Sequence, residues 1–443
     1  MKQFYFKIAQ KTFLSLFLGI SLLLGTQGMQ AAEITSAQSG NWTDTTTWVG
    51  GVVPVATDYV IIATGHNLTF ALVANTTLGS LNIQSNASLT VSGNFTFTMG
   101  SVSPYSNIAG SLTITGTASR TFGNLTVAST GSISSTGGAT SVSSSTPLPW
   151  VNNGTVVLTT LGLPTGKTVD NNGTFSCAMG STSVGTFNNN SGATYNLVGT
   201  VAATVNNFGT INSSSFSGTA ATAIINNKAT GVINFTGGTM SATNLVLNAT
   251  EAGNTVNYSA GVSQTLKDVQ YSNIILSNAG TKTIPTVASG TLCTGTLSIA
   301  DAAKASPTNT NVGVGTLSLG GVGQTANTYG GASSTAAVKN STYFTGVGYI
   351  NVQTTLGVAQ FSANDLKLYP NPATGGNFTI SLPFMQEEAK VSILNLAGQT
   401  IYSRTIPAGE NSDINPNTSL AAGVYFVKME QGGQSITKKI IVN

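Results

Sequence analysis

An asparagine-rich motif recurs at nearly regular intervals in the middle of this chain. Asn152-Asn153-Gly154-Thr155 returns as Asn171-Asn172-Gly173-Thr174, and three looser copies follow. The glycines of successive copies are 19, 19, 17 and 22 residues apart. A recurrence of this length indicates a solenoid, in which each repeat forms one coil and stacks on its neighbours.

Each copy supplies residues suited to a corner and then to a strand. Asparagine and glycine tolerate the left-handed backbone conformation of a sharp corner, and a β-branched or apolar run follows each glycine. The predicted corner residues are Asn152, Gly154, Asn171, Gly173, Asn189, Gly192, Asn206, Gly209, Asn226 and Gly231. Stacked coils would place these asparagines above one another, so we expect their amides to form ladders.

A sandwich built from hairpins with Asn-Gly turns is the alternative explanation of the motif. Strands in such folds recur about every 8–12 residues, which is shorter than the spacing in this chain. Glycine accounts for 51 of 443 residues and charged residues for only 7%, a composition that suits short strands and turns better than helices. The sequence therefore predicts an all-β fold whose body is a parallel β-solenoid, or β-helix.

Charge density divides the chain near residue 360. Residues 33–360 hold seven acidic and seven basic residues, whereas the 83 residues of 361–443 hold twelve charged residues. Such a change in composition indicates separate domains. We expect a signal peptide at 1–32, a β-solenoid body with an N-terminal cap at 33–302, irregular late coils or a spacer at 303–360, and a C-terminal domain at 361–443.

The beginning of the chain is typical of a secretory signal peptide. Three lysines precede an apolar run at 13–24, and the small residues Ala31 and Ala32 mark the expected cleavage region. An uncleaved anchor is the alternative, but the run is shorter than the about 20 residues that span a bilayer. Without those three lysines, 13 basic residues balance 13 acidic ones, which argues against nucleic acid or an anionic membrane as a partner.

The end of the chain carries several motifs in a fixed order. Leu368-Tyr369-Pro370-Asn371-Pro372 is followed by segments 376–380, 391–399 and 420–427, and Thr437-Lys438-Lys439-Ile440-Ile441-Val442 lies next to the terminus. As a set they resemble the C-terminal sorting domain of the type IX secretion (Por) system of Bacteroidota. The residues that carry the motif are Pro370, Asn371, Pro372, Gly376, Gly398, Gly423, Tyr425, Lys438 and Lys439.

Alternating apolar positions in the same region predict a small Ig-like β-sandwich. Pro370 and Pro372 are expected in a turn before the sandwich, because proline cannot donate a hydrogen bond within a central strand. A fibronectin-like module that merely ends the chain is the alternative to a sorting domain.

The resemblance implies an export route. Sec passage followed by type IX translocation would bring the protein to the outer-membrane surface or into the medium, with the secretion machinery as partner of the C-terminal domain. In the family this domain is often removed while the body is released or attached to lipopolysaccharide. Lipopolysaccharide attachment after C-terminal cleavage is therefore a further expectation.

A second resemblance lies at the expected start of the mature chain. The segment 39–69, with its Ser39-Gly40-Asn41-Trp42 opening, is similar to the start of many Bacteroidota surface proteins and to the opening of G8-like β-rich domains. Trp42 and Trp48 are expected to plug the open end of the first coil, as a solenoid requires. Aromatic contacts with carbohydrate are the alternative role for these two residues.

Candidate catalytic groups are sparse. Enzymes on β-solenoids need clustered carboxylates together with Lys, Arg or His, but Asp170 has no acidic residue one period away. His66, the only histidine, is expected to be a turn or core residue. Cys177 and Cys293 lie 116 residues apart, too far along a stack of coils for a disulfide. We predict no catalytic, cofactor-binding or metal-binding residues.

The sequence therefore predicts a non-enzymatic adhesin or structural protein, secreted or attached to the cell surface. A neutral surface rich in Thr, Ser and Asn offers hydrogen bonds over a large area, which suits a polysaccharide or matrix ligand. A secreted carbohydrate-active enzyme, a β-helix lyase or hydrolase, is the alternative. Ice binding is disfavoured because Thr113-Ile114-Thr115 does not recur at the coil spacing.

Overall fold

The computed structural model describes most of the chain from residue 31 onward. It covers 31–443 apart from 101–104, 146–147, 181–182, 219–222, 241–243, 301, 309–310, 355–365, 376, 382–387, 408–412, 415, 417–418 and 432–433. Residues 1–30 of the expected signal peptide lie outside the described residues, whereas Ala31 and Ala32 are described and exposed. The chain divides into two compact units, 1–356 and 357–443, and each is described by itself.

The described secondary structure consists of strands and two short 3-10 helices, η1 (Thr45–Thr47) and η2 (Val49–Gly51). Within the described ranges, the structure has no helix with the length and apolar character that a bilayer crossing requires. The predicted all-β fold is confirmed.

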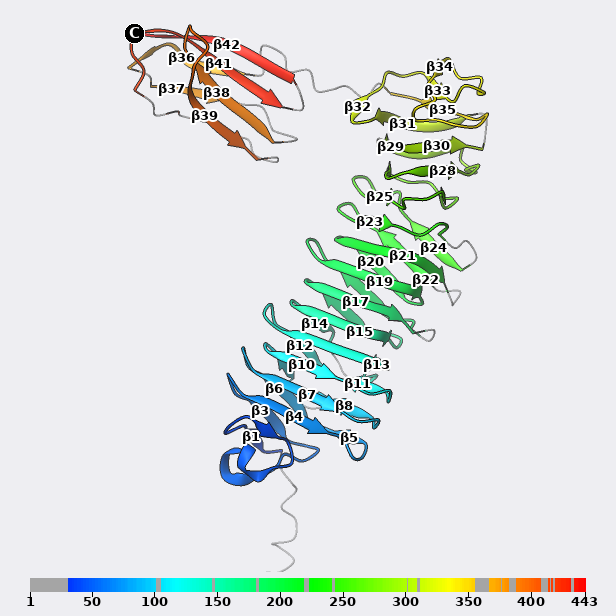
Figure 1. Ribbon diagram of the computed structural model, residues 1–443, viewed down its shortest axis with the longest axis vertical. Helices are drawn as coiled ribbons and strands as arrows, with labels where there is room; N and C mark the ends of the chain where they lie inside the picture. The colour runs from blue at the N-terminus through cyan, green and yellow to red at the C-terminus, as the bar shows by residue number, and fades with distance from the viewer. Residues whose placement is uncertain are drawn as a thin grey trace, which may run out of the picture. The chain divides into compact units, whose positions relative to one another are not determined.

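The first unit is a parallel β-solenoid, in which each strand pairs with the equivalent strand of the next coil (Figure 1). Its first sheet has 11 strands. They are β1 (Glu33–Thr35), β3 (Tyr59–Ile62), β6 (Ser80–Ile83), β9 (Ser106–Ile108), β12 (Leu125–Val127), β14 (Trp150–Asn152), β16 (Thr168–Asn171), β18 (Thr186–Asn189), β20 (Thr204–Asn207), β22 (Ala223–Asn227) and β24 (Leu245–Asn248).

The second sheet runs along the next side of every coil. Its main strands are β2 (Gly40–Asn41), β4 (Asn67–Ala71), β7 (Ser88–Ser92), β10 (Ser111–Ile114), β13 (Ser132–Val142), β15 (Thr155–Gly162), β17 (Thr174–Met179), β19 (Thr194–Val201), β21 (Thr210–Gly218), β23 (Val232–Phe235), β25 (Thr255–Tyr258), β27 (Asn273–Leu276), β29 (Thr291–Ile299) and β31 (Val312–Leu319). Three short strands, β5 (Thr76–Thr77), β8 (Phe97–Met99) and β11 (Arg120–Phe122), pair in series and lead into the second half of β13.

The coils continue into the segment predicted to be irregular coils or a spacer. A third, 3-stranded sheet joins β26 (Gln264–Thr265), β28 (Gly280–Ile284) and β30 (Ala303–Pro307). The last coil is followed by β32 (Val322–Gly323), β33 (Thr328–Gly330), β34 (Val338–Lys339) and β35 (Tyr349–Val352). β35 still pairs in parallel with β31, but its other partner, β33, is antiparallel to it, so the parallel stacking ends at β35.

Alternate residues of each strand point into the solenoid, where equivalent positions stack in register. Val169, Phe187, Val205 and Ile225 are one such column on the first sheet, and all four are fully buried. This column is the apolar half of the predicted strand alternation and supplies the continuous core that holds neighbouring coils together.

Trp42 and Trp48 close the N-terminal end of this core. Both side chains are buried, their rings are 4.8 Å apart at the centroids, and Trp42 stacks on Phe70. The Trp48 indole N–H donates to the Trp42 carbonyl oxygen at 2.7 Å. The predicted plug is confirmed, and this burial removes both rings from contact with a carbohydrate.

The repeat motif forms its corners in a different way from that predicted. None of the predicted corner asparagines has a positive φ, and among the predicted glycines only Gly192 does, at 79°. The left-handed explanation is therefore wrong for the others. Glycine is needed at Gly154, Gly173 and Gly209 because a Cβ atom there would collide with a backbone carbonyl oxygen of the preceding coil.

The second unit is a small β-sandwich. It contains β36 (Lys367–Thr374), β37 (Asn377–Ser381), β38 (Ala389–Leu394), β39 (Thr400–Ile406), β40 (Asp413–Ile414), β41 (Gly423–Gln431) and β42 (Gln434–Val442), in the order β39-β38-β41-β42-β36-β37-β40. Its own core includes Phe378, Val391, Val427 and Ile440. The Ig-like sandwich predicted from apolar alternation is confirmed.

The prediction that Pro370 and Pro372 lie in a turn before the sandwich is wrong. Both prolines lie within β36. The pairing of β36 with β37 shifts register between Tyr369 and Thr374. The prolines, which have no backbone N–H to donate, therefore lie outside the hydrogen-bonded part of this strand pair. The Asn371 side chain bridges this irregularity to β42. Its Nδ2 donates to the Lys439 carbonyl oxygen at 3.1 Å, and its Oδ1 accepts the Ile441 N–H at 3.0 Å.

Candidate binding face of the solenoid

A buried ladder of asparagine amides runs along the corner of the solenoid. The Nδ2 of every member except the last donates to the Oδ1 of the asparagine one coil further on, at 2.7–2.8 Å. The members are Asn152, Asn171, Asn189, Asn207 and Asn227, all at most 2% exposed. The second N–H of the first four donates to a backbone carbonyl of the strand one coil on, so this predicted ladder is present and its role is to hold the corner.

Two predicted corner residues lie elsewhere. Asn206 and Asn226 precede the ladder members Asn207 and Asn227 by one residue, and successive residues of a strand face opposite sides. They therefore point outward from the first sheet. Both copies of the motif contain two consecutive asparagines, so the sequence alone did not distinguish the inner from the outer one.

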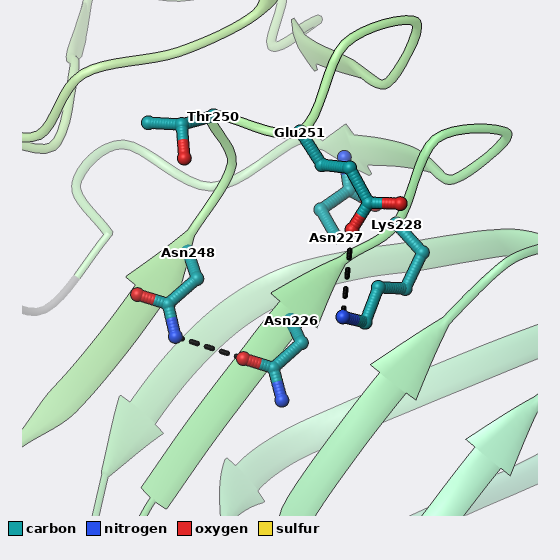
Figure 2. A pocket seen from close by; sticks show the side chains of 6 residues that line it. All are labelled: Asn226, Asn227, Lys228, Asn248, Thr250 and Glu251. Carbon is teal, nitrogen blue, oxygen red and sulfur yellow. Dashed lines mark hydrogen bonds and ion pairs between the residues drawn. The ribbon is translucent and has the colours of Figure 1, made fainter.

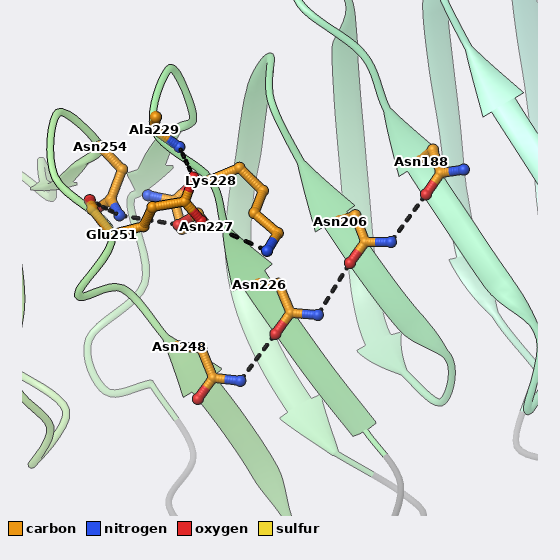
Figure 3. A network of polar contacts seen from close by, with 9 residues as sticks. All are labelled: Asn188, Asn206, Asn226, Asn227, Lys228, Ala229, Asn248, Glu251 and Asn254. Carbon is orange, nitrogen blue, oxygen red and sulfur yellow. Dashed lines mark hydrogen bonds and ion pairs between the residues drawn. The ribbon is translucent and has the colours of Figure 1, made fainter.

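A second asparagine ladder lies on the outward surface of the first sheet, over β16 to β24 (Figure 3). Asn248 donates to Asn226, Asn226 to Asn206, Asn206 to Asn188, at 2.8–2.9 Å. The series ends on a carboxylate, because Asn188 Nδ2 donates to Asp170 Oδ1 at 2.8 Å. We call these four asparagines the outer ladder.

The outer ladder keeps hydrogen-bonding capacity for a ligand. An asparagine amide carries two N–H donors, and each ladder nitrogen makes one hydrogen bond to a partner among the described residues. Its members are half-buried, and Asn248 is exposed. A directional series of amides also polarises its members, which strengthens the remaining donors.

On β16, β18 and β20, a threonine lies two residues before Asp170, Asn188 and Asn206, on the same outward side of the strand. Thr168, Thr186 and Thr204 are aligned in register and are followed by the apolar Ile224 and Val246. The first sheet thus presents parallel columns of hydroxyl and amide groups, spaced by about 4.8 Å from coil to coil.

Single threonines also align on the second sheet. Thr69, Thr90 and Thr113 are register partners in successive coils. The tripeptide Thr113-Ile114-Thr115 itself does not recur, because Thr113 and Ile114 pair with Thr90 and Val91 of the preceding coil and with Ser134 and Ser135 of the next.

A hollow lies at each end of the outer ladder. The one beside Asp170 and Asn188 has a volume of about 200 Å³ and is also lined by Leu148, Pro149, Gly166, Lys167 and Thr168. The one beside Asn226 and Asn248 has a volume of about 90 Å³ and is also lined by Asn227, Lys228, Thr250 and Glu251 (Figure 2).

The second hollow contains an ion pair at its rim. Lys228 Nζ lies 3.4 Å from Glu251 Oε2, and the backbone N–H of Ala229 donates to Glu251 Oε1 at 3.1 Å. Both charged side chains are partly exposed, so the pair contributes little to stability but fixes the position of an ammonium and a carboxylate beside the amides. Sequence reasoning missed this pair, because its members lie 23 residues apart with no motif around them.

A similar ladder lies on the second sheet. Asn257, Asn234, Asn212 and Asn196 are linked at 3.0–3.3 Å, and Asn196 donates to Ser176 Oγ. None of these side chains lines either hollow of the outer ladder or the third hollow, beside Leu163 and Val184. This second-sheet ladder provides a matched comparison for the outer ladder.

The dispersed titratable residues do not converge in the described part of the chain. No three His, Cys, Asp or Glu residues there are grouped as a metal site requires. Asp170 faces Val151 and Asn188 across the sheet rather than another acid. His66 follows Gly65, whose φ is 82°, so it lies at a turn, as predicted. Its Nδ1 lies 2.8 Å from Ser36 Oγ.

The described motif residues of the C-terminal unit have structural roles. Gly398 is in a turn with φ of 79°, and Gly423 begins β41. The Tyr425 hydroxyl donates to the Ala421 carbonyl at 3.0 Å, and Lys438 and Lys439 pair with Val427 and Phe426 of β41. Gly376 lies outside the described residues.

Comparison with known proteins identifies this unit. Residues 367–443 match the family described as the secretion system C-terminal sorting domain. A search of the curated proteins finds no match to the chain. The sorting domain implies interaction with the type IX secretion machinery, and export to the cell surface or the medium. The chain therefore carries a type IX C-terminal sorting domain after a β-solenoid body.

Proposed function

We propose that this protein is a non-enzymatic adhesin or structural protein that binds an uncharged polysaccharide or matrix polymer outside the cell. The carrying observation is the outer ladder, a straight series of amides with a hollow at each end. The export implied by the sorting domain agrees with an extracellular ligand.

The chemistry of the outer ladder suits a neutral polymer. Between the charged residues at its two ends, the face presents amide, hydroxyl and apolar side chains, so an anionic polymer would gain nothing there. Hydroxyl groups of a sugar both donate and accept, as amides and threonine hydroxyls do. The repeated columns would let one extended chain make the same contact at several coils, which raises affinity through multiple weak bonds.

Binding of purified residues 32–360 to a panel of neutral and charged polysaccharides tests the proposal. Asn206→Ala with Asn226→Ala is expected to lower affinity about tenfold, which corresponds to a loss of ~1.4 kcal/mol. The control is Asn212→Ala with Asn234→Ala in the second-sheet ladder, which removes the same chemistry from the other face. Equal binding of both variants would place the ligand elsewhere, and absence of binding to the whole panel would refute the glycan ligand.

A carbohydrate-active enzyme is the function that competes with this proposal. Glycoside cleavage requires two carboxyl groups within about 5–10 Å of each other across a sugar. Asp170 and Glu251 lie at opposite ends of the outer ladder, four coils apart. Release of sugars from the same polysaccharide panel would overturn the non-enzymatic assignment, and thermal hysteresis of the same sample would indicate ice binding instead.

The proposed location is the outer-membrane surface of a bacterium of the Bacteroidota, after Sec export and cleavage of a signal peptide near Ala31 and Ala32. The motifs at both ends of the sequence support this route. Attachment of the body to lipopolysaccharide after removal of the C-terminal unit is part of the same proposal. Surface proteolysis and mass measurement of the mature protein test location and attachment.

A further inference from the structure

Asp58 is a buried carboxylate without a cationic side chain as partner. Its exposed fraction is 5%, and neither of the two ion pairs found among the described residues includes it. Burying a carboxylate is costly unless positive charge or hydrogen-bond donors compensate for lost water. Two backbone N–H groups do so: Val55 donates to Oδ2 at 2.8 Å and Ala32 donates to Oδ1 at 3.1 Å.

The first sheet holds the Ala32 nitrogen in this position. The Ala32 carbonyl oxygen accepts the backbone N–H of Tyr59 at 2.9 Å, and the next residue, Glu33, begins β1 and pairs with Tyr59. Ala32 is also one of the two small residues in the expected cleavage region. One of the two residues that donate to the Asp58 carboxylate is therefore one that export processing would affect.

We propose that processing hydrolyses the Ala31–Ala32 peptide bond and that the new α-ammonium group of Ala32 forms an ion pair with Asp58. A signal peptidase would add one water, leaving a carboxylate on Ala31 and an amine on Ala32 that is mostly protonated near pH 7. The nitrogen that gains the charge is the atom already 3.1 Å from Asp58 Oδ1. This inference rests on the proposed export route.

Position distinguishes this bond from its neighbours. A cut after Ala32, the boundary expected from the sequence, would remove the nitrogen that Asp58 binds, and a cut before Ala31 would place the amine one residue beyond the contact. The small residue Ala31 directly precedes the proposed bond, which meets one of the two small-residue positions of a signal cleavage site; Met29 stands at the other. The Asp58 carboxylate then receives its countercharge only when processing has taken place.

The pair would complete the N-terminal cap of the solenoid. Asp58 already links the first strand, through Ala32, to the segment after η2, through Val55. A charge-assisted hydrogen bond is stronger than one between neutral groups, so processing would tighten this link. The cap of the mature protein is then more stable than that of the precursor.

A charge-only comparison tests the ion pair. Protein spanning 32–443 is prepared with a free Ala32 amine and with an acetylated one, which retains an N–H donor but carries no charge. Both forms are also made with Asp58→Asn. Acetylation is expected to speed hydrogen exchange at the Val55 and Tyr59 amides about fivefold in the Asp58 protein and to have no effect in the Asp58→Asn protein.

Each outcome decides one part of the inference. Equal exchange in the free and acetylated forms would overturn the ion pair. If Asp58→Asn does not fold, the acetylation effect in the unaltered protein must shrink in 1 M salt, where charge pairing is screened within about 3 Å. Mass measurement of the exported protein must give Ala32 as the first residue; another terminus overturns the cleavage site. Polysaccharide binding is measured separately and does not depend on either result.

Discussion

Single ionisable side chains inside the solenoid are held in neutral form or satisfied by backbone groups. Cys177 and Cys293 are both free and fully buried, and burial raises the pKa of each thiol to about 12. Lys282 is also buried, and its Nζ donates to the Ala260 carbonyl at 2.6 Å and to Gln264 Oε1 at 2.8 Å. Burial lowers the pKa of Lys282. The two cysteines therefore contribute to packing, and Lys282 links the Ala260 carbonyl and the Gln264 side chain.

The buried thiols predict a loss of stability at alkaline pH. An unfolded cysteine ionises near pH 8.5–9, and the folded thiols hold their protons to about pH 12. Because the folded pKa is raised, this contribution is complete below about pH 9 and is lost as pH rises toward 12. The free energy of unfolding should fall by up to ~4 kcal/mol per cysteine over this window.

Chemical denaturation at pH 8, 9.5 and 11 measures the effect. Cys177→Ala should reduce the pH dependence relative to the unaltered protein, although it also lowers stability at every pH by leaving a cavity. A pH dependence that stays the same in Cys177→Ala and Cys293→Ala would show that these thiols do not contribute.

At the scale of strands and ladders, the sequence predicted the solenoid, the amide ladder and the sandwich, but not which asparagine enters which ladder. The period was readable because the coils between residues 152 and 231 repeat the same corner motif. The register could not be predicted, because a shift of one residue exchanges the inner and outer sides of a strand. In Asn206-Asn207 either asparagine could be the inner one, since both positions carry the same residue. The hollows at Asp170 and Glu251 depend on contacts between coils, which no local motif records.

The inner ladder predicts unequal costs for two adjacent asparagines. Asn189→Ala removes hydrogen bonds to Asn207 and the Thr210 carbonyl and leaves the buried Asn171 amide without its acceptor, so it should destabilise the body by about 2–3 kcal/mol. Asn190→Ala loses one exposed bond to Asn172 and should cost about 0.5 kcal/mol or less. Urea denaturation of both variants measures the difference; equal costs would contradict a structural role for the inner ladder.

Two glycines of the motif should respond differently to alanine. At Gly173 the added Cβ would collide with the Gly154 carbonyl oxygen of the preceding coil, so Gly173→Ala should cost about 2–3 kcal/mol. Gly192 has open space around it but a φ of 79°, so Gly192→Ala should cost only about 1–2 kcal/mol of backbone strain. Thermal unfolding of both variants gives the order, and a reversed order would mean that conformation rather than space selects glycine here.

For the whole molecule, folding and export belong to separate parts of the chain. The solenoid and the sandwich each have their own apolar core. Residues 367–443 match the sorting domain family, whereas the outer ladder lies in the solenoid. The export address and the proposed binding face are therefore separable.

This separation predicts the fate of a truncated protein. Deletion of 361–443 should leave a folded body in the periplasm, because the body keeps its core but loses the sorting domain. Fractionation and circular dichroism measure location and fold. The matched control is an unrelated periplasmic reporter fused to 361–443, which should reach the surface or medium. Normal surface display of the truncated protein would refute the role of the C-terminal unit.

The parallel stacking makes the length of the body adjustable in whole coils. Every interior coil offers its neighbour the same backbone edge, so only the two ends limit growth: the tryptophan plug at Trp42 and Trp48, and the antiparallel β33 and β35. Gain or loss of one repeat would change the distance between these ends by about 4.8 Å and leave all other coils intact. Gain or loss of whole repeats would therefore set the length of such a body in fixed steps.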